Sequence, residues 1–106
     1  MAALDPTRGS EQAGKRPVII VSRDAINQNS NVVICVPVSD RANFQRIYPS
    51  QIVLKKGTAG LTMDSVVMCE QVRAITVDRL QIRIGRLDHG DMEAVENRLR
   101  VALDLE

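Results

Sequence analysis

Residues 31–39 read N-V-V-I-C-V-P-V-S, a short run of branched aliphatic side chains that is typical of a buried strand. Pro37 has no N–H to donate, so we expect that end of the strand to lie at a sheet edge or a bulge. A similar run, P-V-I-I-V-S at 17–22, precedes it and predicts another buried strand. Between the two, the Asn, Gln and Ser residues of 24–31 predict a turn region.

The remaining chain predicts shorter elements on both sides of these two strands. S-V-V-M-C-E-Q-V at 65–72 predicts a third strong strand. The other expected elements are a loop at 5–17, a polar loop at 40–50, a short strand at 51–55, a turn at 56–60, a helical turn at 76–81 with Thr76 as its cap, and a half-exposed strand at 82–87.

A long helix is expected only at the C-terminus. Met92, Val95, Leu99 and Ala102 recur at spacings of three and four, and Asp88 or Asp91 can serve the helix N-terminus. Short strands followed by one helix predict a mainly β fold with a C-terminal helix, as a strongly bent sheet or small barrel. The 106 residues are expected to form one domain.

The composition excludes several classes of protein. Aromatic residues make up 2% of the chain, which argues against binding by base stacking. No run approaches the roughly 20 apolar residues of a membrane helix, and no signal region is visible, so we expect a cytoplasmic protein without membrane contact. The formal net charge is +1, but residues 1–60 carry eight Lys or Arg and four acids, so this half can hold an anion; a solvated mixed-charge surface is the alternative.

Cysteine and histidine usage gives no sign of a metal or cofactor. Cys35 and Cys69 each lie inside an apolar run and are expected to be buried small hydrophobes rather than a disulfide or a metal pair. His89, the single histidine, has no second ligand nearby and is expected to begin the C-terminal helix. We therefore expect a protein that uses no cofactor.

Three places could carry chemistry. In the loop at 9–17, Glu11 is a possible base or orienting group, and Lys15 and Arg16 are anion binders, unless this is only a solvated basic loop. Ser39 ends a buried strand, where its hydroxyl could hold a phosphoryl oxygen or serve no chemical role. Glu70, expected in a buried strand, either faces a site or pairs with an Arg such as Arg73.

Arg, Ser and Glu without a cofactor suit metal-free chemistry on a phosphate ester. An RNA 2′-hydroxyl can attack its own adjacent phosphate, and the protein need only move protons and stabilise the crowded phosphorus.

Three blocks of the sequence resemble the MazF/PemK/Kid family of ribonuclease toxins. They are D-P-T-R-G-S-E-Q-A-G-K-R-P-V-I-I-V-S (5–22), V-V-I-C-V-P-V-S (32–39) and S-V-V-M-C-E-Q-V-R-A-I (65–75), followed by R-L-D (86–88) and a helix. The resemblance implies a toxin of a type II toxin–antitoxin pair, with a small SH3-like (CcdB/PemK-like) barrel and a homodimeric state. It also implies metal-independent cleavage of single-stranded RNA (mRNA) to 2′,3′-cyclic phosphate and 5′-hydroxyl ends, and inhibition by a cognate antitoxin.

The resemblance also assigns roles to residues. It makes Arg16 the acid/base and phosphate stabiliser, puts Ser39 where the family has Thr, and makes Glu11 the functional Glu of G-x-E-Q. Glu70 stands where the Kid branch has a catalytic Asp. That branch also uses an Arg and a His, where this chain has Met68 and Ser10, so Arg16 with Ser39 is the safer pair. Further expected contacts to RNA come from Ser10, Gln12, Lys15 and Arg41, with Gln71 beside Glu70 as a possible substrate-orienting residue.

One departure from the family pattern lies at the N-terminus. Family members carry an aromatic-rich strand before the D-P loop, whereas only Met1–Leu4 precede Asp5 here, so we expect that strand to be shortened. The alternatives to a ribonuclease are a non-catalytic module of the same fold, either a gyrase poison of the CcdB kind or an antitoxin-binding decoy, and a basic scaffold without enzymatic activity.

Overall fold

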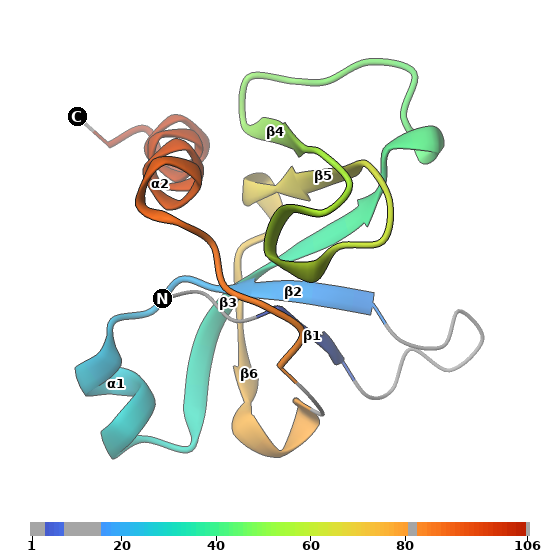
Figure 1. The fold of residues 1–106 in the computed structure, drawn as a ribbon. Coiled ribbons are helices and arrows are strands. Elements are labelled where there is room, and N and C mark those ends of the chain that lie inside the picture. The colour runs from blue at the N-terminus through green and yellow to red at the C-terminus, as the bar shows by residue number, and fades with distance from the viewer. Residues whose placement is uncertain (1–3, 8–15, 81–82, 106) are drawn as a thin grey trace.

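The computed structural model describes residues 4–7, 16–80 and 83–105 (Figure 1). Its strands are β1 (Leu4–Thr7), β2 (Arg16–Ile20), β3 (Val32–Asp40), β4 (Gln51–Leu54), β5 (Ser65–Met68) and β6 (Arg73–Thr76). The helices are α1 (Asp24–Asn29) and α2 (His89–Leu103), and single 3₁₀ turns cover η1 (Arg41–Asn43), η2 (Thr58–Gly60), η3 (Cys69–Gln71) and η4 (Val77–Arg79).

β3 is the strand around which the sheet is organised, and all its pairings are antiparallel. Its first half pairs with β6, its middle with β2 and its last three residues with β5, giving the order β1-β2-β3-β5-β4 with β6 beside β3. Pro37 lies between the last residue paired to β6, Cys35, and the first paired to β5, Val38. The missing N–H of Pro37 therefore falls where β3 changes neighbours, which is the kind of position its chemistry predicts.

The mainly β fold with a C-terminal helix is confirmed, but the expected barrel is wrong. The strand order begins at β1 and ends at β4, and no pairing joins these two edge strands in the described part of the chain, so the sheet is open. β3 crosses the molecule in Figure 1, with β4 and β5 at one end and β6 at the other. Because β3 changes neighbours along its length, the sheet bends without closing.

The alternation of side chains along β2 and β3 gives the sheet two apolar faces. Ile19, Val36 and Val38 belong to the larger core, which α2 covers through Val95. Among the described residues, the opposite face holds a smaller core of Val18, Val33, Cys35 and Ile75, with Ile20 and Leu80 packed against it. Both cysteines are buried and free, as expected, with Cys69 in the larger core and Cys35 in the smaller.

The C-terminal helix is confirmed as an amphipathic element. Asp88 is its N-cap, and the Asp88 carboxylate accepts a hydrogen bond of 2.7 Å from the backbone N–H of Asp91. Val95 is completely buried, and Met92, Leu99 and Ala102 pack against the same core. The apolar stripe therefore fixes which side of α2 faces the sheet. In the described residues, no helix combines the length and apolar character that crossing a bilayer requires.

Two expectations near the strong strands are wrong. The turn expected at 24–31 contains α1, which is held by the buried Ser22: the Asn27 side-chain amide donates to the Ser22 carbonyl at 3.1 Å, and the Ser22 hydroxyl donates back to Asn27. The strand expected at 65–72 ends at Met68, and η3 turns the chain into β6. Apolar content alone could not locate this break, because Cys69 after it is as buried as the strand.

Two further boundaries differ from the expectation. The loop expected at 5–17 is wrong at its start, since Asp5–Thr7 pair with β2 as part of β1. The strand expected at 82–87 is not formed at 83–85, where the chain packs against η2 instead. A Cβ on Gly85 would lie 1.9 Å from the Ala59 carbonyl oxygen, so this approach needs glycine. The helical turn near Thr76 is confirmed as η4, although the Thr76 side chain does not cap it.

Candidate nucleic-acid interface

The register of β2 against β3 brings Arg16 next to Ser39. Val18 pairs with Pro37, Ile19 with Val36 and Ile20 with Cys35. The pairing ends two residues short of both Arg16 and Ser39, so it brings the first residue of β2 and the last part of β3 to the same end of this strand pair. Two residues that are 23 positions apart in the chain thereby come to line one groove.

Arg16 and Ser39 both line a groove of about 370 Å³. Its other lining residues are Pro17, Val38, Asp40, Asn43, Leu61, Thr62, Met63 and Ser65. Arg16 is exposed, and within residues 16–80 and 83–105 no side chain pairs with its guanidinium. Within this described part of the chain its donors remain available to an anion, and a guanidinium matches the geometry of a phosphate.

The segment after Ser39 carries two groove residues that the sequence interpretation missed. The Asp40 carboxylate accepts from the Ala42 N–H at 2.9 Å and so caps η1. The last residue of that turn, Asn43, donates from its side-chain amide to the Ser39 hydroxyl oxygen at 3.2 Å. The signal for the cap was present in the sequence, because an Asp side chain at the start of a turn commonly accepts a hydrogen bond from the backbone N–H two residues later.

The other expected RNA contacts are placed differently. Arg41 lines an adjoining hollow of about 470 Å³ that shares Asp40 with the groove, and one of its guanidinium nitrogens donates to the Phe44 carbonyl at 2.8 Å. Arg41 therefore lies beside the groove and does not line it. Four more of the expected site residues lie outside the described residues; they are Ser10, Glu11, Gln12 and Lys15.

Glu70 and Gln71 do not line the groove. Both lie in η3, beyond the end of β5 that is remote from Ser65, and both are exposed. The Glu70 carboxylate accepts from the Ser50 hydroxyl at 2.9 Å and from the Gln51 amide at 2.8 Å. Its hydrogen bonds therefore join η3 to β4, and the Arg expected as its partner is replaced by two uncharged donors.

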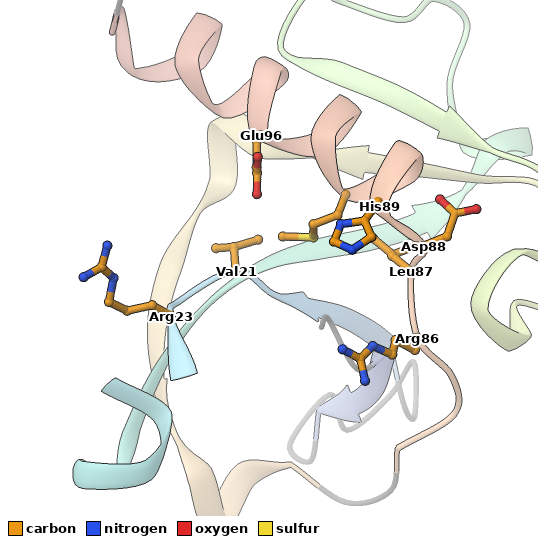
Figure 2. A pocket seen from close by; sticks show the side chains of 8 residues that line it. Val21, Arg23, Arg86, Leu87, Asp88, His89 and Glu96 are labelled. Atoms are coloured by element: carbon orange, nitrogen blue, oxygen red, sulfur yellow. The ribbon is translucent and has the colours of Figure 1, made fainter. Parts of the chain in front are cut away.

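A second hollow, of about 640 Å³, lies between the start of α2 and the residues that follow β2 (Figure 2). Figure 2 shows Arg86 and His89 on one side of it and Val21 and Arg23 on the other, with Glu96 above them. Asp88 points away from the other labelled side chains, as its capping role requires. His89 is the first residue of α2, as expected, and does not line the groove of Arg16.

The two cysteines are unsuited to nucleophilic chemistry. The pKa of the Cys69 thiol is raised to about 11, mainly by burial and also by the nearby Glu70 charge, against an opposing effect of Arg98. Burial also raises the pKa of the Cys35 thiol, opposed by Arg73. A thiol that stays protonated near neutral pH is a poor nucleophile. Nowhere in the described residues do three or more His, Cys, Asp or Glu side chains gather to hold a metal ion.

The fold and the groove together define a small antiparallel β protein that presents a guanidinium and a hydroxyl on one concave surface. A family model described as PemK-like, MazF-like toxin of type II toxin-antitoxin system matches residues 1–103. The chain belongs to this toxin family.

Two curated relatives match almost the whole chain. Endoribonuclease MazF9 of Mycobacterium tuberculosis is 36% identical over 107 residues, which cover 96% of this chain and 89% of the relative. Endoribonuclease MazF of Staphylococcus saprophyticus is 35% identical over 105 residues, which cover 99% of this chain and 87% of the relative.

Solved structures share the fold. Mycobacterium tuberculosis toxin MazF-mt6 superposes with a TM-score of 0.82 at 23% identity, covering 98% of each chain. An endoribonuclease in complex with its cognate antitoxin from a mycobacterial species also gives a TM-score of 0.82, at 21% identity, covering 98% of this chain and 93% of that one. These likenesses confirm the architecture independently of the sequence blocks.

Proposed function

We propose that the chain is an endoribonuclease that cleaves single-stranded RNA in this groove without a metal ion. The observation that carries the proposal is the placement of the Arg16 guanidinium and the Ser39 hydroxyl in one groove. Both are donors, and a phosphodiester presents two anionic oxygens to such donors. The curated relatives that match almost the whole chain are named as endoribonucleases, which supports the same activity here.

The proposed reaction is an internal transesterification. The RNA 2′-oxygen forms a bond to phosphorus and the bond from phosphorus to the 5′-oxygen breaks, which leaves a 2′,3′-cyclic phosphate and a 5′-hydroxyl. Arg16 and Ser39 hold the non-bridging oxygens, where negative charge builds up in the transition state. We assign removal of the 2′-hydroxyl proton to Glu11 and return of a proton to the 5′-oxygen to Arg16, following the family resemblance.

The proposal includes the partners of a family toxin. We infer a homodimer in the cytoplasm that is inhibited by a cognate antitoxin. A structural relative was solved in complex with its cognate antitoxin, which supports this partner. The non-catalytic alternatives, a gyrase poison or a decoy, are less favoured because they give no role to a groove that pairs Arg16 with Ser39.

The test is cleavage of a long RNA by the purified protein in EDTA. We expect discrete fragments from the wild type, and a rate lower by about 10²–10³-fold in Arg16→Ala, because one charged donor to the transition state is lost. Arg23→Ala is the matched control: Arg23 is also an exposed arginine, but it follows the opposite end of β2 and does not line the groove. Equal rates for Arg16→Ala and Arg23→Ala would contradict the assignment of the groove.

A further inference from the structure

The segment S-D-R-A-N (39–43) forms a compact unit beside the proposed catalytic groove. Asp40 caps the turn through the Ala42 N–H, and the Phe44 N–H donates to the Arg41 carbonyl at 3.1 Å. The Arg41 guanidinium closes the same turn by donating to the Phe44 carbonyl. Three hydrogen bonds over the five residues 40–44 therefore fix the position from which the Asn43 side chain donates back to Ser39.

The direction of the hydrogen bond between Asn43 and Ser39 determines what the hydroxyl can do. A serine hydroxyl has one proton to donate and two lone pairs to accept with. Asn43 is the donor in this contact, so it occupies a lone pair of the Ser39 oxygen, and the hydroxyl proton has no acceptor among the residues that the structure describes. That proton is available to a phosphoryl oxygen in the groove, which both residues line.

Serine at position 39 makes such a contact necessary. A β-branched threonine is restricted at χ1 by its methyl group, whereas a serine hydroxyl has three staggered positions of similar energy. Ser39 is half-buried and lines the groove, and Asn43 is the only side chain within the described residues that hydrogen-bonds to its hydroxyl. A donor that holds the oxygen in place restores the restriction that the missing methyl would have supplied.

We propose that Asn43 is a positioning residue for RNA cleavage, which holds the Ser39 hydroxyl so that its proton points to the phosphate. This inference rests on the proposed function. It predicts a specific dependence: the Asn43 side chain matters only while residue 39 has a hydroxyl, and it matters less when residue 39 is threonine.

The experiment measures kcat and KM for cleavage of a short RNA that contains one cut site. The variants are Asn43→Ala, Ser39→Ala, Ser39→Thr and the two doubles that combine Asn43→Ala with each change at Ser39. Asn29→Ala is the matched control, because Asn29 is also exposed and donates its side-chain amide within a helix, to the Ala25 carbonyl at 2.8 Å. Thermal midpoints are recorded for all variants, and the exposed position of Asn43 predicts little change in them.

We expect Asn43→Ala to lower kcat by about 3- to 10-fold with KM nearly unchanged. It should have no effect in the Ser39→Ala background, and Ser39→Thr should restore most of the lost kcat. An unchanged kcat in Asn43→Ala, or an equal loss with and without the Ser39 hydroxyl, would overturn the positioning role while leaving the ribonuclease intact. A folded wild type that cuts no RNA would overturn the proposed function itself, and this inference with it.

Discussion

Replacement of Glu70 by alanine separates a structural role of this residue from a catalytic one. Glu70 accepts two hydrogen bonds, from Ser50 and from Gln51. Gln51 is 5% exposed and makes two further hydrogen bonds. Its side-chain oxygen accepts from the Tyr48 N–H, and its backbone carbonyl accepts from the Arg98 side chain of α2. Glu70→Ala therefore removes the acceptor of a buried amide that helps join β4, η3 and α2.

The loss of stability depends on which hydrogen-bond donor is left without an acceptor in Glu70→Ala. Ser50 is half-exposed and can turn to water, so its lost bond costs little. The buried Gln51 amide loses its acceptor, which lowers the free energy of unfolding by about 1–2 kcal/mol. With an unfolding entropy of about 2.1 cal/mol/K per residue over 106 residues, this is a fall in Tm of about 5–9 °C. Glu70→Gln keeps one carbonyl acceptor and should lose about half as much.

The assay combines thermal unfolding with RNA cleavage at a temperature where every variant is folded. Glu93→Ala serves as the control, since it removes an exposed carboxylate of α2 that has no side-chain hydrogen bond within the described residues. We expect Glu70→Ala to lower Tm and to leave kcat within twofold of the wild type. A large loss of kcat with an unchanged Tm would refute this reasoning and would indicate a catalytic role for Glu70.

Three more predictions concern stability. Gly85→Ala should lower the free energy of unfolding by about 3 kcal/mol in urea titrations, because its Cβ would collide with the Ala59 carbonyl. Gly90→Ala is the control, since its Cβ would meet nothing closer than 3.5 Å and should leave the free energy of unfolding nearly unchanged. Equal urea midpoints for the two variants would contradict the close approach of Gly85 to Ala59. Cys69 has a raised pKa in the folded state, so ionisation of the unfolded thiol from about pH 9 should lower the stability of the wild type relative to Cys69→Ala, by up to about 2 kcal/mol at pH 11. A stability difference between these two proteins that is flat from pH 8 to 11 would count against a buried thiol. Asp88→Ala should cost about 1 kcal/mol by removing the N-cap of α2, and a helix content and Tm equal to wild type would show that the cap is dispensable.

The sequence predicted the parts of the fold that depend on local apolar patterns. The buried strands around Val18 and Val36 and the apolar stripe of α2 are of this kind. A short run of branched apolar residues indicates a buried strand, and apolar residues spaced by three and four indicate the buried side of a helix. The break after Met68 was missed because Cys69 stays buried while the backbone turns. The helix α1 was missed because its Asn-rich residues favour turns in general, and its support comes from the hydroxyl of Ser22 outside it.

The candidate site was predicted in part for a similar reason. Arg16 and Ser39 could be named from their positions at strand ends and from the family blocks, but their proximity depends on the register between β2 and β3, which no local pattern specifies. Asn43 was missed because its contact with Ser39 forms only once η1 has folded. The family resemblance likewise predicted a small SH3-like barrel, whereas the sheet is open, because sheet closure depends on pairing between β1 and β4, which are far apart in the chain.

The most direct test of the central claim is the mass of the RNA fragments that the wild type and Arg16→Ala release in EDTA. The account predicts that the wild type leaves 5′ fragments lighter by one water than a linear phosphate, together with 3′ fragments that begin with a free 5′-hydroxyl, and that Arg16→Ala releases almost none. Intact RNA after incubation with a folded wild type, or 5′ fragments whose newly formed end is a 3′-hydroxyl, would contradict it.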